Sequence, residues 1–131
     1  MNVSSIGQPP VPNPSVDYHD IAQVHQELMR VADTLNGMVR DVAAARTCKE
    51  FNSDQRKRKL AQAVVPFLND GMAAGAAEHQ ARADKVYASA MLDLKADYEW
   101  AEEVLAREAA LKARHDSLRS IASGLRAAAG L

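Results

Sequence analysis

Apolar residues recur three or four positions apart along the first part of the chain. The residues in this repeat are Ile21, Val24, Leu28, Val31, Leu35, Met38, Val42 and Ala45. A repeat averaging 3.5 residues keeps one narrow apolar stripe of a helix turned toward a partner helix. The polar residues between them, such as Glu27, are expected to face solvent. The pattern predicts a helix over residues 15–48, capped at its start by Ser15.

Cap and turn signals then mark a second helix over residues 53–69. Asn52 and Gln55 have the spacing of a capping box at its start. Pro66 has no backbone N–H to donate and is expected to kink or shorten this helix. The residues "NDG" at 69–71 predict a turn at its end.

A third helix is predicted over residues 76–128, which contain no proline and one glycine, Gly124. Its apolar stripe consists of Tyr87, Met91, Leu94, Tyr98, Ala101 and Leu105 and, after a shift of one residue, of Leu111, Leu118, Ile121, Leu125 and Ala128. A helix of about 50 residues would be about 75 Å long. So long and narrow a helix is not stable alone, so it must pack against the first helix, other copies of the chain, or both.

Together these elements predict an all-α fold, a long helical hairpin or coiled-coil bundle of two to three helices. Of the 131 residues, 47% are hydrophobic but only 5% aromatic, which favours narrow stripes over a large globular core and suggests a homo-oligomer. Residues 15–131 are expected to form a single helical domain. Residues 1–14 hold four of the five prolines and are expected to form an extended, flexible arm.

No arrangement of residues in the sequence indicates catalysis, a metal site or a cofactor. Cys48 has no CxxC partner, no glycine-rich phosphate loop is present, and no two of the histidines have metal-ligand spacing; these are His19, His25, His79 and His115. We therefore expect a protein that is not an enzyme. No apolar stretch approaches a membrane span and the N-terminus does not resemble a signal peptide, so we expect no membrane partner and a cytoplasmic location.

The charges are segregated along the chain although the formal net charge is only −1. Residues 46–59 carry six Lys and Arg against two acidic residues, and residues 107–131 carry five against two. Residues 17–41 and 93–103 carry an acidic excess. Two interpretations remain open. Acidic and basic segments could pair between helices or subunits, or the basic segments could form a track for a phosphate backbone.

The densest basic segment is Arg56, Lys57, Arg58 and Lys59. Four consecutive residues cover a full turn of a helix, so these cations cannot all face one acidic partner. At least some of them must point toward solvent or a ligand.

The C-terminal half carries a resemblance to a known family. The segment "YEWAEEVLAREAALKARHDSLRSIASGLRA", residues 98–127, resembles the ends of small helical proteins of tailed phages, the UvsY-type recombination mediators. "DSLRS" at 116–120 is the most specific part, "EHQARADKVY" at 78–87 is also similar, and the whole resemblance covers residues 50–128. Leu118, Ile121 and Leu125 would pack along the stripe in any helical protein.

This resemblance implies an oligomeric helical protein that binds single-stranded DNA and helps to load a recombinase or annealing protein onto it. The matching basic residues here are Arg56, Lys57, Arg58, Lys59, Arg114, Arg119 and Arg126. Because no aromatic residues are interleaved with these cations, binding should be mainly electrostatic and sensitive to salt. The alternative is a structural or scaffolding coiled-coil protein of a phage particle or assembly, without DNA binding.

Overall fold

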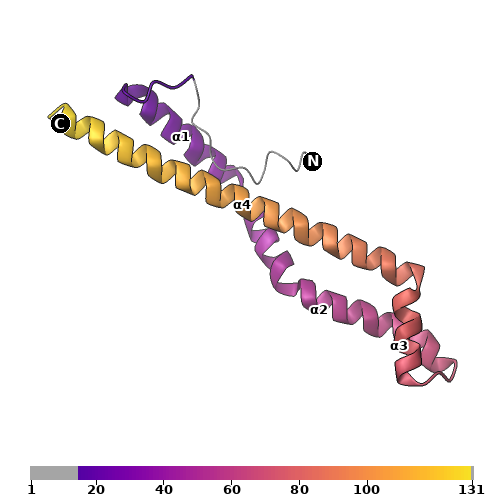
Figure 1. Ribbon diagram of the computed structural model, residues 1–131. Coiled ribbons are helices and arrows are strands. Elements are labelled where there is room, and N and C mark those ends of the chain that lie inside the picture. The colour runs from indigo at the N-terminus through magenta and orange to yellow at the C-terminus, as the bar shows by residue number, and fades with distance from the viewer. Residues whose placement is uncertain (1–14, 131) are drawn as a thin grey trace. The chain divides into compact units, whose positions relative to one another are not determined.

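The computed structural model describes residues 15–130, which are 88% helical and contain no strand. This confirms the all-α class. In the described residues four helices follow one another instead of the expected two to three, namely α1 (Ile21–Gly37), α2 (Val39–Asn69), α3 (Ala74–Ala83) and α4 (Lys85–Ala128) (Figure 1). The proline-rich arm predicted at residues 1–14 lies outside the described residues, and assembly into a homo-oligomer stays a prediction.

The first helix is shorter than the expected range 15–48 and does not begin at Ser15. Asp20 is the N-cap of α1, with an extended backbone (φ −101°, ψ 109°), and its carboxylate accepts a hydrogen bond from the Ala22 N–H at 2.9 Å. Aspartate is as good a cap as serine, and Asp20 directly precedes Ile21, where the apolar stripe starts. The helix therefore begins with the stripe.

The same helix ends early, at Gly37, and Met38 separates it from α2. The Met38 N–H donates to the Leu35 carbonyl at 3.1 Å, three residues back, so the α-helical pattern of bonds tightens there. Glycine is a weak helix former, which explains why the break falls at this point of the stripe. A Cβ atom added to Gly37 would meet nothing within 4 Å, so no close approach requires this glycine.

No helix boundary occurs near residues 48–53, where a cap had been expected. Asn52 lies inside α2 and is only 7% exposed. Its side chain bonds to α4 rather than to its own helix start, as described below. Pro66 also lies inside α2, which continues to Asn69.

The predicted turn at residues 69–71 closes α2. The Met72 N–H donates to the Phe67 carbonyl at 3.1 Å, and the Gly71 N–H donates to the Leu68 carbonyl at 3.0 Å. This pair of bonds is the Schellman arrangement, which needs a residue with positive φ. Gly71 has φ +89°, a conformation that glycine adopts without strain.

The long helix expected over residues 76–128 is divided at Asp84. The backbone of Asp84 is extended (φ −69°, ψ 136°) and its N–H donates to the Ala81 carbonyl, which ends α3. The Asp84 carbonyl accepts from the Ala88 N–H at 2.9 Å, which starts α4. Aspartate is a favoured residue at a helix start, so one residue separates the two helices.

The chain divides into two compact units, each of which is described by itself. Unit 1 comprises residues 1–43 and 103–131, of which 15–43 and 103–130 are described, and unit 2 comprises residues 44–102. That residues 15–131 fold as a single domain stays a prediction.

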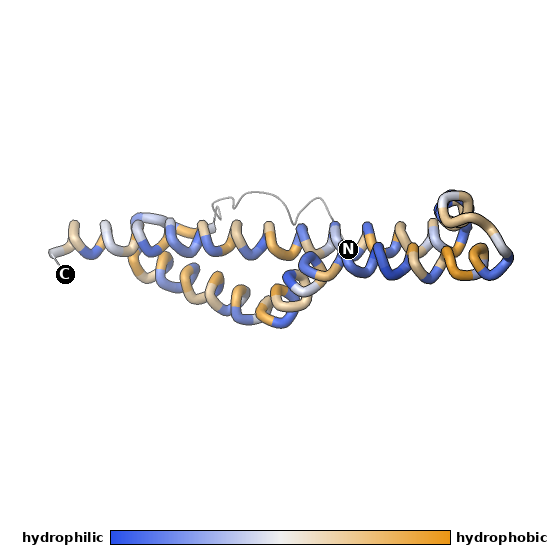
Figure 2. Tube along the Cα trace, turned by 90° about the horizontal axis from the view of Figure 1, so that it is seen from below, coloured by the Kyte–Doolittle hydropathy of each residue, from blue (hydrophilic) through white to orange (hydrophobic). Residues whose placement is uncertain are grey.

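In unit 1, α1 packs against the C-terminal part of α4. The buried cluster consists of Val24, Val31, Leu118 and Ala122, surrounded by partly buried Tyr18, Leu28, Leu35, Leu111, Ile121 and Leu125. Of the remaining stripe residues, Val42 is buried, and Ile21 and Met38 are partly buried. Figure 2 shows apolar and polar residues alternating along the helices, as narrow apolar stripes require.

In unit 2, α2 runs antiparallel to the N-terminal part of α4, since Lys49 contacts Tyr98 and Asn52 contacts Leu94. The buried hydrophobic residues of this unit are all alanines: Ala45, Ala77, Ala81 and Ala101. The larger apolar side chains of this unit are partly buried or exposed. Unit 2 therefore has a much smaller apolar core than unit 1.

Candidate nucleic-acid interface

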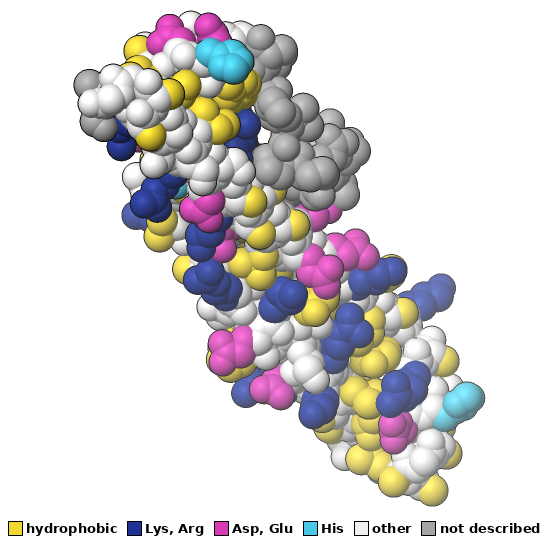
Figure 3. Space-filling model, turned by 60° about the vertical axis from the view of Figure 1, so that its left-hand side comes forward, with side chains coloured by type: hydrophobic (Ala, Val, Ile, Leu, Met, Phe, Trp, Pro, Cys, Tyr) yellow, Lys and Arg dark blue, Asp and Glu magenta, His cyan; other side chains and the backbone are white. Residues whose placement is uncertain are grey.

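On one face of the molecule (Figure 3), charged side chains of both signs are mixed. On the face shown in Figure 3, Lys and Arg side chains lie among Asp, Glu and apolar side chains, with no uniformly basic area. A polyanion would therefore have to be held at local sites. Two such sites stand out, one in each unit.

The first site contains the basic turn, which we define as Arg56, Lys57, Arg58 and Lys59. All four side chains are exposed on α2. Successive residues of a helix are about 100° apart around its axis, so the four point in different directions. Only Arg56 and Lys59, three residues apart, share a side of the helix. One nucleic-acid strand therefore cannot contact all four cations of one chain.

Arg56 lines a hollow of about 340 Å³ between α2 and α4. The other lining residues are Lys49, Asn52, Ser53 and Tyr98, and the Lys49 ammonium lies 5.3 Å from the centre of the Tyr98 ring. A cation this close to an aromatic face is attracted by it. We name this site the Tyr98 hollow. No aromatic residue is interleaved with the basic turn in the sequence, and it is Tyr98 of another helix that lies beside Lys49 and Arg56.

Sequence reasoning missed the Tyr98 hollow because Tyr98 is distant from the basic turn in the sequence and was assigned to the apolar stripe. One usable signal exists. Lys49, Ser53 and Arg56 are four and three residues apart, so they lie on one face of any helix that contains them.

Asn52 joins the two helices beneath the Tyr98 hollow. Its Nδ2 donates to the Leu94 carbonyl of α4 at 3.0 Å, and its Oδ1 accepts from Arg56 Nε at 2.9 Å. The bond uses one of the five N–H donors of the Arg56 guanidinium. The remaining donors stay free to bind a phosphate, and the side chain is held in position.

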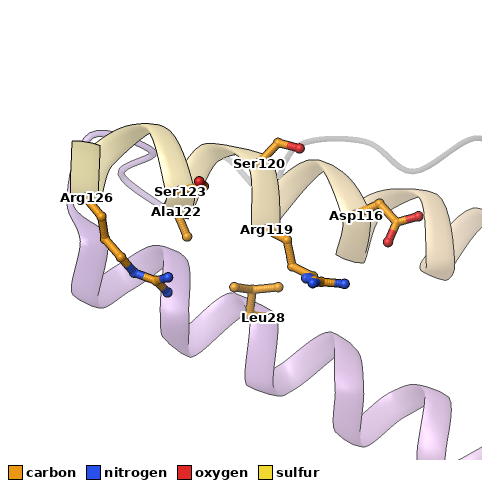
Figure 4. A pocket seen from close by; sticks show the side chains of 7 residues that line it. All are labelled: Leu28, Asp116, Arg119, Ser120, Ala122, Ser123 and Arg126. Carbon is orange, nitrogen blue, oxygen red and sulfur yellow. The ribbon is translucent and has the colours of Figure 1, made fainter. Parts of the chain in front are cut away.

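The second site is a hollow of about 480 Å³ in unit 1, which we name the arginine hollow. It is lined by Leu28, Asp116, Arg119, Ser120, Ala122, Ser123 and Arg126 (Figure 4). The side chains of Arg119 and Arg126 extend from α4 toward α1 and lie on either side of Leu28, whereas Ser120 points away. Asp116 and Arg119 of the "DSLRS" segment and the later Arg126 thus lie along one open groove.

Arg126 also contacts α1 directly. Its Nη2 lies 2.9 Å from His25 Nε2. Because a guanidinium is only a donor, the His25 Nε2 accepts this bond and the ring carries its proton on Nδ1. The contact holds the Arg126 side chain across the groove.

The structure does not bring Arg114 together with the exposed cations. Its side chain is 10% exposed, and its Nη2 donates to the Tyr18 hydroxyl at 2.7 Å and lies 3.3 Å from Glu27 Oε1. Arg114 is therefore already paired inside unit 1. A direct contact with DNA stays a prediction from the resemblance alone.

Glu27 was expected to face solvent and is instead 4% exposed. Arg30 binds the carboxylate through Nε at 2.9 Å and through a second nitrogen, and Arg114 approaches it from α4. The pKa of the Glu27 carboxyl is lowered, mainly by the hydrogen bond from Arg30, with Arg114 adding to the effect and burial opposing it. Two arginines thus compensate for burying the charge.

Comparison with known proteins gives no match. No protein-family model matches this chain, and no curated protein or solved structure is significantly similar to it. The resemblance to UvsY-type mediators therefore rests on the sequence pattern alone.

Residues 15–130 contain neither a metal-binding cluster nor a membrane-spanning helix. In this part of the chain, no group of three or more His, Cys, Asp or Glu could hold a metal ion. None of the helices that these residues form is both long and apolar enough to cross a membrane. The two hollows with their arginines remain the strongest candidates for a binding function.

Proposed function

We propose that this protein binds single-stranded DNA without sequence preference through the basic turn and the Tyr98 hollow. The proposal rests on one observation, that the cations of the basic turn have no acidic partner among the described residues. Within residues 15–130, no acidic side chain forms an ion pair with Arg56, Lys57, Arg58 or Lys59. Pairing between acidic and basic segments of one chain therefore does not account for this cluster.

The residues around Arg56 suit a single strand better than a duplex. Lys49 and Arg56 offer cationic donors to phosphates, and Tyr98 offers an aromatic ring beside them. Positively charged grooves with aromatic rings are the usual means of binding single strands, because every base has a face that can stack. If each chain neutralises about three phosphates, the logarithm of affinity falls with the logarithm of salt concentration with a slope of about −2.

The wider role that we propose is that of a recombination mediator. In this role an oligomer of the chain holds single-stranded DNA and helps to load a recombinase or annealing protein, in the cytoplasm of the host cell if a phage encodes the protein. The resemblance of residues 98–127 to UvsY-type mediators supports this role. Oligomerisation would repeat the basic turn and so compensate for the few cations that each chain presents.

The test is fluorescence anisotropy of a labelled oligo-dT strand, at low and then at moderate salt. We expect binding that weakens with salt, and a large loss of affinity in the variant Arg56→Gln/Lys59→Gln, which removes the two cations on the side of the Tyr98 hollow. A matched control is Arg40→Gln/Lys85→Gln, which removes the same charge from exposed positions outside both sites. Absence of binding at low salt, or equal losses in the two variants, would refute the proposal.

A second candidate function is that of a structural or scaffolding protein. Unit 2 exposes several large apolar side chains: Phe51, Val65, Leu68, Met72, Val86 and Leu92. Val86 is 76% exposed and borders an apolar hollow of about 480 Å³ that also contains Phe67 and Tyr87. Surfaces of this kind often bind other proteins. A scaffold would ignore oligo-dT but form an assembly of fixed stoichiometry in sedimentation analysis.

A further inference from the structure

We propose that the arginine hollow is a separate binding site for a ligand with linked phosphate groups. Its oxyanions would bind between Arg119 and Arg126, in unit 1. This proposal does not depend on DNA binding at the basic turn, which belongs to unit 2.

The spacing of the two arginines selects the kind of ligand. Arg119 and Arg126 are seven residues apart on α4, so their Cα atoms are separated by about 10.5 Å along the helix. Both side chains extend to the same groove and lie on either side of Leu28 (Figure 4). A ligand that contacts both must carry more than one anionic group. A guanidinium binds phosphate through two parallel hydrogen bonds, which makes a short chain of phosphates a good fit.

The remaining lining residues suit the same ligand. Ser123 lies between the two arginines in the sequence and on the same side of α4, where its hydroxyl can donate to a phosphate oxygen. Leu28 and Ala122 supply apolar surface beside the charged groups, where charge interactions are stronger than in bulk water. Asp116, the acidic residue of the lining, precedes Arg119 along α4. Figure 4 shows the Asp116 side chain beyond Arg119, on the side away from Arg126, so it does not lie between the two arginines.

His25 orders one end of the site before a ligand arrives. Arg126 donates to His25 Nε2 at 2.9 Å, which holds its guanidinium toward α1. Ordering a flexible side chain in advance lowers the entropic cost of binding. The volume of about 480 Å³ is within the usual range for small-ligand sites.

Two sources supply this chemistry: a free polyphosphate, such as a nucleoside triphosphate, and successive phosphodiesters of a nucleic-acid strand. The probes are therefore inorganic triphosphate and oligo-dT. Each is titrated into the full chain while the NMR signals of the Leu28 methyl groups and the Ser123 amide are followed. Calorimetry gives the affinity for triphosphate.

The variants are Arg119→Gln and Arg126→Gln, with Arg107→Gln as the control, an exposed arginine of the same helix outside the hollow. We expect saturable shifts at Leu28 and Ser123 with triphosphate. Each of the first two variants should lose about tenfold or more in affinity, the effect of one charge-assisted contact. Arg107→Gln should lose less than about twofold, as expected for a distant charge under salt screening.

Two outcomes would overturn the proposal: no saturable shift at Leu28 or Ser123, or an equal loss in Arg107→Gln, which would indicate diffuse electrostatic attraction. The variant Arg126→Lys controls for misfolding. It keeps the positive charge, so its affinity should lie between those of the native chain and Arg126→Gln. Titrating oligo-dT into the Arg56→Gln/Lys59→Gln variant separates the sources. Shifts of the Leu28 signals with oligo-dT would identify the ligand as the phosphates of a nucleic-acid strand. Shifts with triphosphate but not with oligo-dT would identify it as a free polyphosphate. Neither result depends on oligo-dT anisotropy, which tests the proposed function.

Discussion

Replacement of Arg114 by Met tests the buried ionic contact between α1 and α4. Arg114 donates to the Tyr18 hydroxyl at 2.7 Å and lies 3.3 Å from Glu27 Oε1, and its own side chain is 10% exposed. Methionine matches the aliphatic part of the arginine side chain and keeps most of its apolar packing. The substitution therefore removes mainly the charge and its hydrogen bonds.

The expected loss follows from these contacts. A hydrogen bond that involves a charged group contributes about 1.5–3 kcal/mol, and removing one partner of a buried ion pair costs about 3–5 kcal/mol. The contact between Arg114 and Glu27 is long, and Glu27 keeps its bonds from Arg30. We therefore expect the free energy of unfolding to fall by about 2–3 kcal/mol, which is within the range for a charged hydrogen bond and below that for a fully broken buried ion pair.

The assay is urea unfolding followed by far-UV circular dichroism at fixed protein concentration. Arg107→Met is the control, since an exposed arginine of the same helix should change stability by less than about 0.5 kcal/mol. The double variant Glu27→Met/Arg114→Met should lose clearly less than the sum of the single variants, because no unpaired charge then remains buried. Equal stability of Arg114→Met and Arg107→Met, or simple additivity, would refute the reasoning.

Three further predictions follow from individual residues. The pKa of Glu27 is lowered from its ordinary value of 4.5. The stability that its carboxylate provides should therefore be present above pH 4.5 and be lost as the pH falls through the lower pKa of the folded state. Urea unfolding of Glu27→Gln should show a weaker pH dependence in this range. Asn52→Ala should lower the free energy of unfolding by about 1–3 kcal/mol, because a buried group with two hydrogen bonds is removed, whereas Ala at the exposed neighbour Ser53 should change it little. Burial, and secondarily the charge of Asp97, raises the pKa of the Cys48 thiol. Iodoacetamide should therefore react with Cys48 more slowly in the folded than in the unfolded chain, and faster in Asp97→Asn than in the native sequence. An equal rate in the folded and unfolded chains would contradict this.

Local pattern was sufficient to predict where helices form but not where they are divided. The apolar repeat through Val24 and Val31 predicts a helix and the face that it buries, and both residues are fully buried. The breaks at Met38 and Asp84 depend on single residues within otherwise helical sequence. Asn52 shows the opposite error, because a residue typical of helix starts is retained inside α2 by a bond to Leu94, 42 residues away.

The candidate sites were harder to predict than the helices, because their side chains contact residues that are distant in the sequence. Exposure of the basic turn follows from four adjacent cations on one helix turn. By contrast, Glu27 is buried because Arg114, 87 residues later in the chain, reaches it from α4. Tyr98 joins Lys49 for the same reason, since helix pairing and not sequence proximity brings them together. Pairwise contacts of this kind leave no trace in the spacing of residues along one helix.

The alanine core of unit 2 has a consequence for how the chain opens. Ala45, Ala77, Ala81 and Ala101 each remove little apolar surface from water, whereas Val24, Val31 and Leu118 of unit 1 remove more. Amide protons of residues 44–102 should therefore exchange with solvent through openings of lower free energy than those beside Val31 and Leu118. A partner that covers the exposed apolar side chains of unit 2 would slow this exchange most, so its footprint can be mapped by the protection it confers.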